Sequence, residues 1–589
     1  MSSVKPSLLF AAICLLLFPA FVFAQTKPEQ QPPPPPGDAQ DVIKFETSLV
    51  QTDVMVFDKN GRFVDGLKPE QFQLKINKTA REISFFEKVT SGAGLVNPTQ
   101  PGELDSVERR KREAQRRAVI FFVDDLHLAP DSLVRTRQAL LDFIDHRIEE
   151  NDLVAITSPS GQIGFLQQFT SSKDALRSAV ARLNYKANPK LDMDRPPMSE
   201  YLASQIRQGN QQAITYFVEE IQKQNCYRTS AGLICSVSPQ SARQLVVNRA
   251  NQVGVEAAPA TDDTLRLLEG LMRTAAQIPG RKLVFVISDG FYLNDTKNGS
   301  IDRIKKVTDA AGRAGVVIYT LDARGIVGES IDINRPMDEK GLLTMATIGD
   351  LAASQDGLNA LAKDTGGQAL RNTNLPMHEW VEKVMDETSN YYLLAWKPDN
   401  DEQKRGKFKQ IEITVVGRPD LKVRVRGSYF KSAALPLLST KKKKDKDPLK
   451  ARDDDMRLVI DAPVSQSEIP TSLNLHFNQM PGMGTSVVAT IAIDDDALTF
   501  DLVDGKLAAD VDIGGIFYDE KGKPINSFVG RLRIFPKAST AAAGTKPKRS
   551  IYQFSTLVPG GLYQVRIGIR DLKSSRAGSA IDWITVPKI

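Results

Sequence analysis

Carboxylates follow two strongly apolar runs of this sequence. Asp124 and Asp125 come directly after Ala118–Val123, and Asp289 ends a second run that starts at Lys282. Carboxylates that meet at neighbouring strand ends repel one another unless a cation or a basic partner lies between them. Because oxygen ligands of this type suit Mg²⁺, Mn²⁺ or Ca²⁺, one interpretation is a reduced metal site in which waters complete the ligand shell. The alternative is that one or two of these aspartates cap the helices that follow.

The two apolar runs predict the strands that position these carboxylates. Each run is short, continuous and bounded by polar or turn residues, which is typical of a strand buried on both faces of a parallel sheet. In open α/β sheets, ligands bind outside the carboxyl ends of the strands. We therefore expect Asp124 and Asp289 at the ligand edge of such a sheet.

The same runs resemble the first and fourth strands of a von Willebrand factor A-type (vWA) domain. In that family they carry part of a divalent-metal site that grips protein ligands. The family's first strand ends in Asp-x-Ser-x-Ser, and both serines ligate the metal. Here Leu126 and Leu128 replace the two serines and supply no oxygen. Ser288-Asp289-Gly290 stands where the family has Thr-Asp-Gly.

The resemblance also implies a threonine ligand on a loop just before a helix. Thr261 and Thr264 both precede the helical run 265–276, and the sequence does not choose between them. The metal ligands implied by the family are therefore Asp124, Asp289 and one of these two threonines, and Asp125 is the further candidate that the cluster of carboxylates adds.

Five short motifs resemble a narrower group, the acidobacterial-type VWFA-related proteins. Their order and spacing match that group over most of residues 41–430. The resemblance implies a domain that binds another protein and carries out no catalysis. The motifs are Val56–Val64, Leu67–Phe72, Pro279–Lys282, Tyr391–Leu394 and Gly427–Tyr429.

Strands and helices alternate between residues 117 and 388, which predicts a doubly wound, Rossmann-like α/β domain. Residues 184–260 exceed the length usual at this position of the family and form an insertion beside the ligand edge. Such an insertion carries binding specificity or, alternatively, forms a stabilising side lobe. The expected elements are helices at 132–149, 174–183, 200–224 and 358–365 and strands at 152–157, 282–288 and 316–321.

All-β segments flank the α/β domain. The strands at 389–430 are too few for an independent domain. We therefore predict that they complete an Ig-like β-sandwich begun at 41–95, so that the α/β domain is inserted into a split sandwich. Strand patterns at 473–476, 485–493, 514–518, 528–535 and 563–569 predict a C-terminal sandwich of Ig-like size. The expected boundaries are a signal peptide at 1–24, a Pro-rich linker at 25–40, the first sandwich part at 41–95, a charged linker at 96–116, the vWA-like domain at 117–388, the second sandwich part at 389–430, a basic linker at 431–458 and the C-terminal sandwich at 459–589.

The N-terminus predicts export. Lys5 precedes the apolar stretch Leu8–Phe23, and Val22-Phe23-Ala24 fits a cleavage site. The alternative, an uncleaved membrane anchor, needs a longer apolar stretch. The mature protein is therefore expected in the periplasm or outside the cell, without an integral membrane segment. Signal removal leaves Cys226 and Cys235, whose even number, close spacing and oxidising compartment predict a disulfide.

Charge and motifs exclude several function classes. The net charge of +6 is small for 589 residues and lies largely in Arg109–Arg117 and Lys441–Lys446, which argues against a nucleic-acid surface. None of the four histidines pairs with another at metal-ligand spacing, and no phosphate loop or Ser/His/Asp order stands out. His127 is expected to cap a helix or lie on the surface. We therefore name no catalytic residue.

Taken together, these features predict an exported protein that binds another protein of unknown identity, for interaction or adhesion, through a degenerate metal-dependent site. One alternative is a structural or assembly scaffold of the cell envelope that works without metal. The other alternative is a hydrolase, for which the sequence offers no nucleophile and base set.

Overall fold

A computed structural model describes the protein over seventeen ranges. The expected signal peptide at 1–24 and the linkers at 25–40 and 96–116 lie outside them. Within these ranges, none of the helices combines the length and the apolar character needed to span a bilayer. The described ranges are 50–90, 117–148, 152–185, 198–230, 232–278, 281–293, 299–326, 342–373, 375–397, 409–425, 428–429, 448–462, 465–480, 482, 484–503, 506–535 and 549–588.

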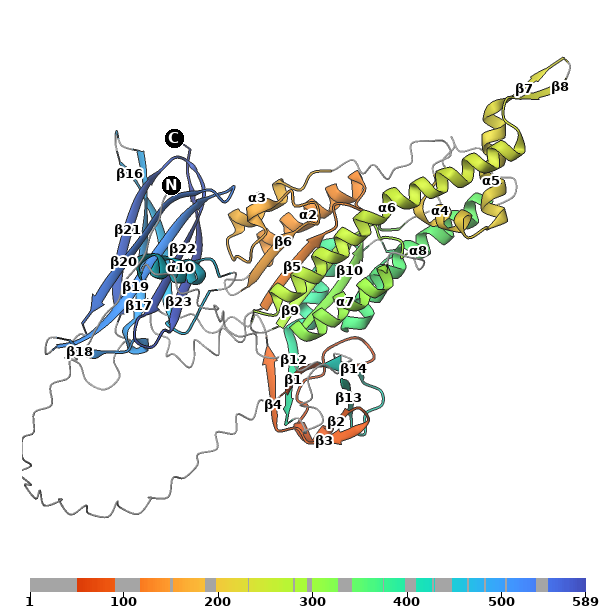
Figure 1. Ribbon diagram of the computed structural model, residues 1–589. Helices are drawn as coiled ribbons and strands as arrows, with labels where there is room; N and C mark the ends of the chain where they lie inside the picture. The colour runs from red at the N-terminus through yellow and green to blue at the C-terminus, as the bar shows by residue number, and fades with distance from the viewer. Residues whose placement is uncertain are drawn as a thin grey trace, which may run out of the picture. The chain divides into compact units, whose positions relative to one another are not determined.

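Parallel strands form the centre of an α/β domain (Figure 1). They lie in the order β11-β10-β9-β5-β6, with β5 at Arg117–Val123, β6 at Leu153–Thr157, β9 at Arg281–Ser288, β10 at Val316–Asp322 and β11 at Ala369–Leu370. The two apolar runs are therefore neighbours, β5 and β9, and they pair in parallel. The chain leaves β5 toward β6 on one side and later enters β9 on the other side. The strand order thus reverses between β5 and β9, where open α/β sheets bind ligands.

Helices cover both faces of this sheet because alternate side chains of β5 point to opposite faces. Phe121 belongs to a core with Phe143 and Trp380, whereas Phe122 belongs to a second core with Leu265. The first face carries α2 (Pro130–His146), α3 (Lys173–Ala181) and α9 (Met377–Ser389), and the second carries α6 (Pro239–Ala275), α7 (Ser300–Ala314) and α8 (Leu342–Thr365). The helix expected at 358–365 is therefore only the end of a longer helix.

Segments from before and after the α/β domain share two antiparallel sheets. Tyr392 pairs with Val54 on one side and with Lys88 on the other. Val54, Leu74 and Ile411 then pack in one core with Tyr392. This is the pairing that a split sandwich requires. The sheets are β14-β1-β12-β4 and β15-β13-β2-β3, with β1 at Val50–Phe57, β2 at Phe72–Ile76, β3 at Thr79–Arg81, β4 at Phe85–Thr90, β12 at Asn390–Trp396, β13 at Lys409–Val415, β14 at Lys422–Val425 and β15 at Ser428–Tyr429.

The C-terminal region forms two further antiparallel sheets around their own core. One has the order β16-β17-β21, and the other has the order β18-β19-β22-β23 with β20 also paired to β19. The sequence did not predict β18, β21 or β23. The bounds are β16 Thr471–Met480, β17 Gly484–Asp494, β18 Asp501–Val503, β19 Lys506–Asp519, β20 Pro524–Ile534, β21 Arg549–Val558, β22 Gly561–Asp571 and β23 Ala577–Val586.

Helix α10 (Pro448–Ile460) replaces the end of the expected basic linker at 431–458. Met456 and Ile460 are buried. A Cβ atom at Gly568 of β22 would lie 2.8 Å from Ile460 Cγ1, so the absence of a side chain there lets the helix approach the sheet. The helix was not predicted because charged residues dominate this segment and only a few apolar residues, such as Met456 and Ile460, pack against the sheet.

The insertion builds a small lobe of helices and one hairpin. The single helix expected at 200–224 is two helices, α4 (Glu200–Arg207) and α5 (Gln211–Asn225), separated by Gly209 with a φ of +84°. The lobe has its own apolar core with the N-terminal half of α6. The hairpin β7–β8, at Cys226–Thr229 and Gly232–Cys235, projects beyond α5 and α6 (Figure 1). The predicted disulfide Cys226–Cys235 closes this hairpin with an S–S distance of 2.05 Å.

Candidate functional site

The candidate site lies where the strand order reverses. Asp124 is the first residue after β5, and Asp289 is the first residue after β9. The backbone N–H of Asp124 donates to the carbonyl of Ile287 at 2.9 Å, which continues the strand pairing to the end of the sheet. Both predicted aspartates therefore lie at the ligand edge of the sheet.

Asp124 is fully buried and accepts hydrogen bonds from three side chains. The Nδ1 atom of His127 lies 2.9 and 2.8 Å from its two carboxylate oxygens. The hydroxyls of Thr264 and Ser288 each donate to one oxygen at 2.8 Å. Burial alone would raise the pKa of this carboxyl, but His127, Ser288 and Thr264 hold that pKa below its ordinary value. Asp124 is therefore an ionised carboxylate whose partners come from its own chain.

His127 corrects a sequence expectation, because its side chain is only 9% exposed and does not lie on the surface. Its ring packs near Phe291, with the ring centroids 5.7 Å apart. Since both oxygens of Asp124 are acceptors, Nδ1 carries the proton that it donates. The other ring nitrogen, Nε2, lies 3.3 Å from the hydroxyl of Thr261. Asp124, His127 and Thr261 thus form one hydrogen-bonded row.

Asp125 turns away from this row. Its carboxylate accepts hydrogen bonds from the backbone N–H of Ser160 at 3.1 Å, from the Ser160 hydroxyl and from the Gln162 amide. These hydrogen bonds hold the loop after β6 against the turn that follows β5. Asp125 therefore has hydrogen-bond partners of its own on that loop, and its part in a metal site stays a prediction.

Asp289 lies at the N-terminus of α2, where its Oδ2 accepts the backbone N–H of Ala129 at 2.7 Å. The aspartate thus caps a helix, as the alternative interpretation expected, but α2 precedes it in the chain. Its Oδ1 is buried and has no hydrogen-bond partner among the residues that the structure describes. Burial raises the pKa of the Asp289 carboxyl, although Ala129, Ser132 and Arg324 oppose that shift.

The two candidate threonines lie inside α6 rather than on a loop before a helix. They are one turn apart, so both face the sheet edge. Thr264 donates to Asp124, and Thr261 contacts His127. The sequence expectation was wrong here because α6 continues through Pro259 and needs no break before Thr261.

These residues do not fit an octahedral metal centre. Both oxygens of Asp124 already accept hydrogen bonds, and the side chains of Leu126 and Leu128 on the following turn offer no oxygen. The buried, unpartnered Oδ1 of Asp289 is the only one of these atoms that favours a cation. Over the described ranges, no three His, Cys, Asp or Glu side chains come together as a metal-binding group. The imidazole of His127 supplies the partner that a metal ion would otherwise supply to Asp124.

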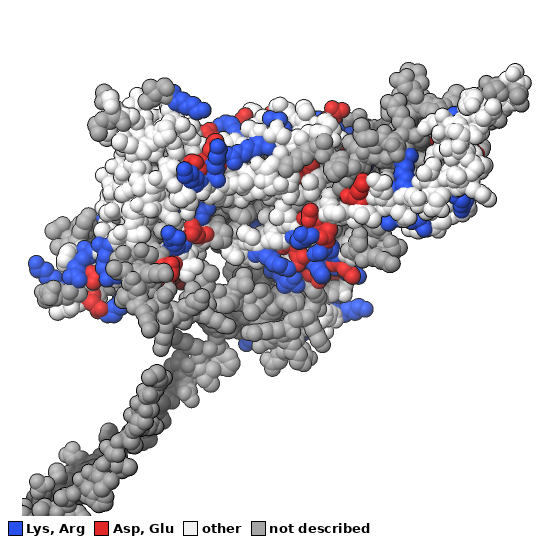
Figure 2. Space-filling model, turned by 45° about the horizontal axis from the view of Figure 1, so that its top comes forward, with Lys and Arg blue, Asp and Glu red and all other residues white. Residues whose placement is uncertain are grey.

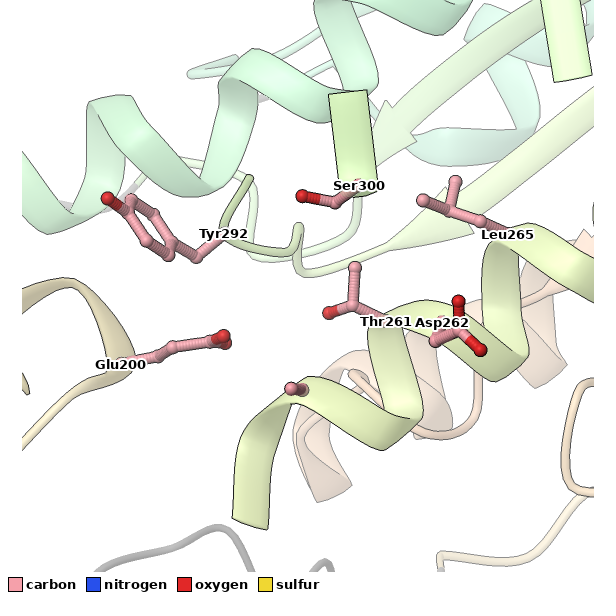
Figure 3. A pocket seen from close by; sticks show the side chains of 7 residues that line it. Glu200, Thr261, Asp262, Leu265, Tyr292 and Ser300 are labelled. Carbon is pink, nitrogen blue, oxygen red and sulfur yellow. The ribbon is translucent and has the colours of Figure 1, made fainter. Parts of the chain in front are cut away.

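Thr261 also lines a pocket that the sequence did not predict (Figure 3). It is small, with a volume of about 20 Å³. The insertion supplies one wall, and the loop after β9 and the start of α7 supply the other. The lining residues are Glu200, Ala258, Thr261, Asp262, Leu265, Tyr292 and Ser300. The one sequence signal for a pocket here was the insertion at 184–260, which was expected to lie beside the ligand edge of the sheet.

Comparison with known proteins adds little. No family model and no curated protein matches this chain. A solved structure described as "X-ray structure of Northeast Structural Genomics Consortium target SoR45" matches with a TM-score of 0.12 and 19% sequence identity, covering 21% of this chain and 89% of that chain. A similarity of this size carries no argument about fold or function, so the function is inferred from geometry.

Proposed function

We propose that this is an exported protein whose vWA-like domain binds another protein through the ligand edge of its sheet and the adjoining insertion, without a metal ion. The observation that carries the proposal is the pocket. Glu200 and Ala258 of the insertion form it together with Tyr292, which follows β9. An insertion that shapes the ligand edge of an α/β sheet is a common source of binding specificity.

Two further features support this proposal. The disulfide Cys226–Cys235 suits an oxidising compartment, in keeping with the expected signal peptide at 1–24. On the face shown in Figure 2, basic and acidic side chains are interspersed, which suits a protein partner better than a polyanion. The hydrogen bonds already made by Asp124 support binding without metal.

Site-specific photo-crosslinking in cells that naturally contain the protein tests this function. A photoreactive phenylalanine derivative would replace Val255 on α6, which is 73% exposed, or Tyr227 on the hairpin, which is 61% exposed. The matched control is Leu502, which is 74% exposed on the C-terminal sandwich. We expect a partner adduct from the first two positions with or without EDTA. Adducts from Leu502 alone, or no adduct, would contradict the proposal, and adducts that require Mg²⁺ would restore the metal-dependent version.

One observation favours a second candidate function, a hydrolase. The row Asp124, His127 and Thr261 has the order carboxylate, imidazole and hydroxyl that activates nucleophiles. Thr261 is only 4% exposed, so a substrate would have to reach it through the pocket. Labelling of Thr261 by a fluorophosphonate probe would establish this candidate. A folded protein that takes no label keeps protein binding as the function.

A further inference from the structure

Backbone hydrogen bonds join the two C-terminal sheets along one side. Just before β16, Ser467 forms a β-bridge with Gly578 of β23, and the N–H of Ile469 donates to the carbonyl of Ala577 at 3.0 Å. The strands β20 and β21 end their sheets on the opposite side. Among the strands that the structure describes, β21 pairs only with β17, and β20 pairs only with β19.

Side chains, rather than backbone hydrogen bonds, connect β20 with β21. Phe528 stacks on Phe554 with the ring centroids 4.4 Å apart, and the amide of Asn526 donates to the hydroxyl of Thr556 at 2.7 Å. Phe554 is only half-buried, whereas Ala489, its cross-strand neighbour on β17, is fully buried. The core between the two sheets is therefore partly uncovered along β21.

The edge strand β21 lacks the features that usually prevent an edge from pairing with another chain. Charged side chains, proline and bulges are the common protections of such edges. All 10 residues of β21 pair with β17 without a register shift, so the strand has no bulge. From Ser550 to Val558 it contains no charged residue, glycine or proline. Its outer face exposes Ile551 by 68% and Leu557 by 52%. A long, regular and uncharged edge of this kind is a template for a further strand.

The order of side chains along β21 makes the strand complementary to a second copy of itself. Consider an antiparallel pairing about a two-fold axis through Phe554. Ile551 then lies opposite Leu557 of the second copy, because the two residues are equally far from Phe554 in the sequence. By the same symmetry, Gln553 lies opposite Ser555 of the second copy. Apolar side chains thus meet apolar ones on the outer face, and polar side chains meet polar ones. Such an isologous contact closes as a dimer.

We propose that β21 pairs antiparallel with β21 of a second copy, so that the sheet β16-β17-β21 continues across a two-fold axis into the same sheet of that copy. The pairing satisfies the backbone N–H and C=O groups of β21 that point away from β17, and it covers Ile551 and Leu557. This contact is separate from the ligand edge of the α/β domain and goes beyond the proposed binding of a partner. A dimer of this kind carries two ligand edges.

Sedimentation velocity of the full chain over a dilution series tests the proposal, and we expect a dimer that dissociates on dilution. The double variant Gln553→Lys with Ser555→Lys places like charges opposite each other at two points of the contact, which should weaken the dimer about tenfold. Gln553→Glu with Ser555→Glu should weaken it similarly. An equimolar mixture of the two double variants should restore the dimer, because opposite charges then face each other.

The matched control is Ser472→Lys with Asn474→Lys. Both residues are exposed on β16, on the same face of the sheet but at its other end, so this variant should dimerise like the wild-type protein. A wild-type chain that stays monomeric throughout the dilution series would overturn the proposal. So would a dimer that survives in both charged variants, or a mixture that does not associate. Restoration in the mixture shows that both variants are folded, which excludes unfolding as the cause of their dissociation.

Discussion

The imidazole of His127 donates its Nδ1 proton to the buried carboxylate of Asp124, with its nitrogen within 2.9 Å of both oxygens. The two residues are three positions apart, on the turn that follows β5. A side chain of the same loop thus satisfies the charge at the centre of the ligand edge.

His127→Ala should therefore destabilise the ligand edge strongly. Removing the donor to a buried carboxylate costs about 3 kcal/mol, because the charge of Asp124 then stays buried without that hydrogen bond. We expect faster amide hydrogen exchange in β5 and β9, measured by mass spectrometry at pH 7. His146→Ala, on the exposed side of α2, is the control and should change stability by about 0.5 kcal/mol or less. Equal effects of the two substitutions would show that the Asp124 contact contributes nothing.

Asp289→Asn should stabilise the protein at neutral pH. Burial raises the folded-state pKa of this carboxyl above the ordinary value of 3.8, so its ionised form costs folding free energy at neutral pH. Asn keeps an acceptor for the N–H of Ala129 and removes the charge, which should gain about 1 kcal/mol. The gain should shrink as the pH falls through the raised pKa and vanish below about 3.8. Thermal unfolding at several pH values measures it, and a gain that grows toward acid pH would contradict the stated cause.

Tyr392→Phe should destabilise the two antiparallel sheets whose strands come from both sides of the α/β domain in the sequence. The Tyr392 hydroxyl donates to the carbonyl of Val64 at 2.8 Å and accepts the N–H of Leu67 at 3.1 Å. Its removal leaves two backbone groups without their partner and should cost about 2 kcal/mol. Hydrogen exchange in β1 and β12 reports the loss. Tyr227→Phe on the exposed hairpin serves as control, and a loss of the same size there would refute the explanation.

Replacing Cys226 and Cys235 together by Ser should open the hairpin without unfolding the domain. A disulfide that closes a loop of this length contributes about 2–3 kcal/mol. None of the hairpin side chains that the structure describes belongs to the core of the insertion lobe, so the melting temperature of the α/β domain should hardly change. Trypsin should cut faster after Arg228, which lies within the hairpin. A marked fall in melting temperature would instead mean that the hairpin supports the lobe.

The sequence predicted the central strands well because their signal is local. The runs that form β5 and β9 are continuously apolar. Such a run is typical of a strand whose sheet is covered by helices on both faces. The contact between Val54 and Tyr392 was also predictable, since three strands after 389 could not stand alone. By contrast, β21 alternates exposed and partly buried residues, and that pattern is weak without its partner β17.

The candidate site was harder to predict, because its chemistry depends on which side chains the fold places within hydrogen-bond distance of each carboxylate. Asp124 and Asp125 are adjacent in sequence and look equivalent. In the fold, one meets His127 and the other meets Ser160. Thr264 contacts Asp124 only because α6 continues past Pro259, and helix propensity argues against that continuation. Residue types were therefore predictable, but their partners were not.

Helix α6 joins the insertion lobe to the central sheet, because its N-terminal half packs in the lobe and its C-terminal part packs on the sheet. At 37 residues it is roughly 55 Å long. Its N-terminal end follows the disulfide-bonded hairpin β7–β8, and Thr261 and Thr264 lie nearer its C-terminal end. Pro259 removes one backbone hydrogen bond just before those threonines, where a helix bends most easily. A displacement of the hairpin would therefore bend α6 near Pro259, next to the threonines that contact His127 and Asp124.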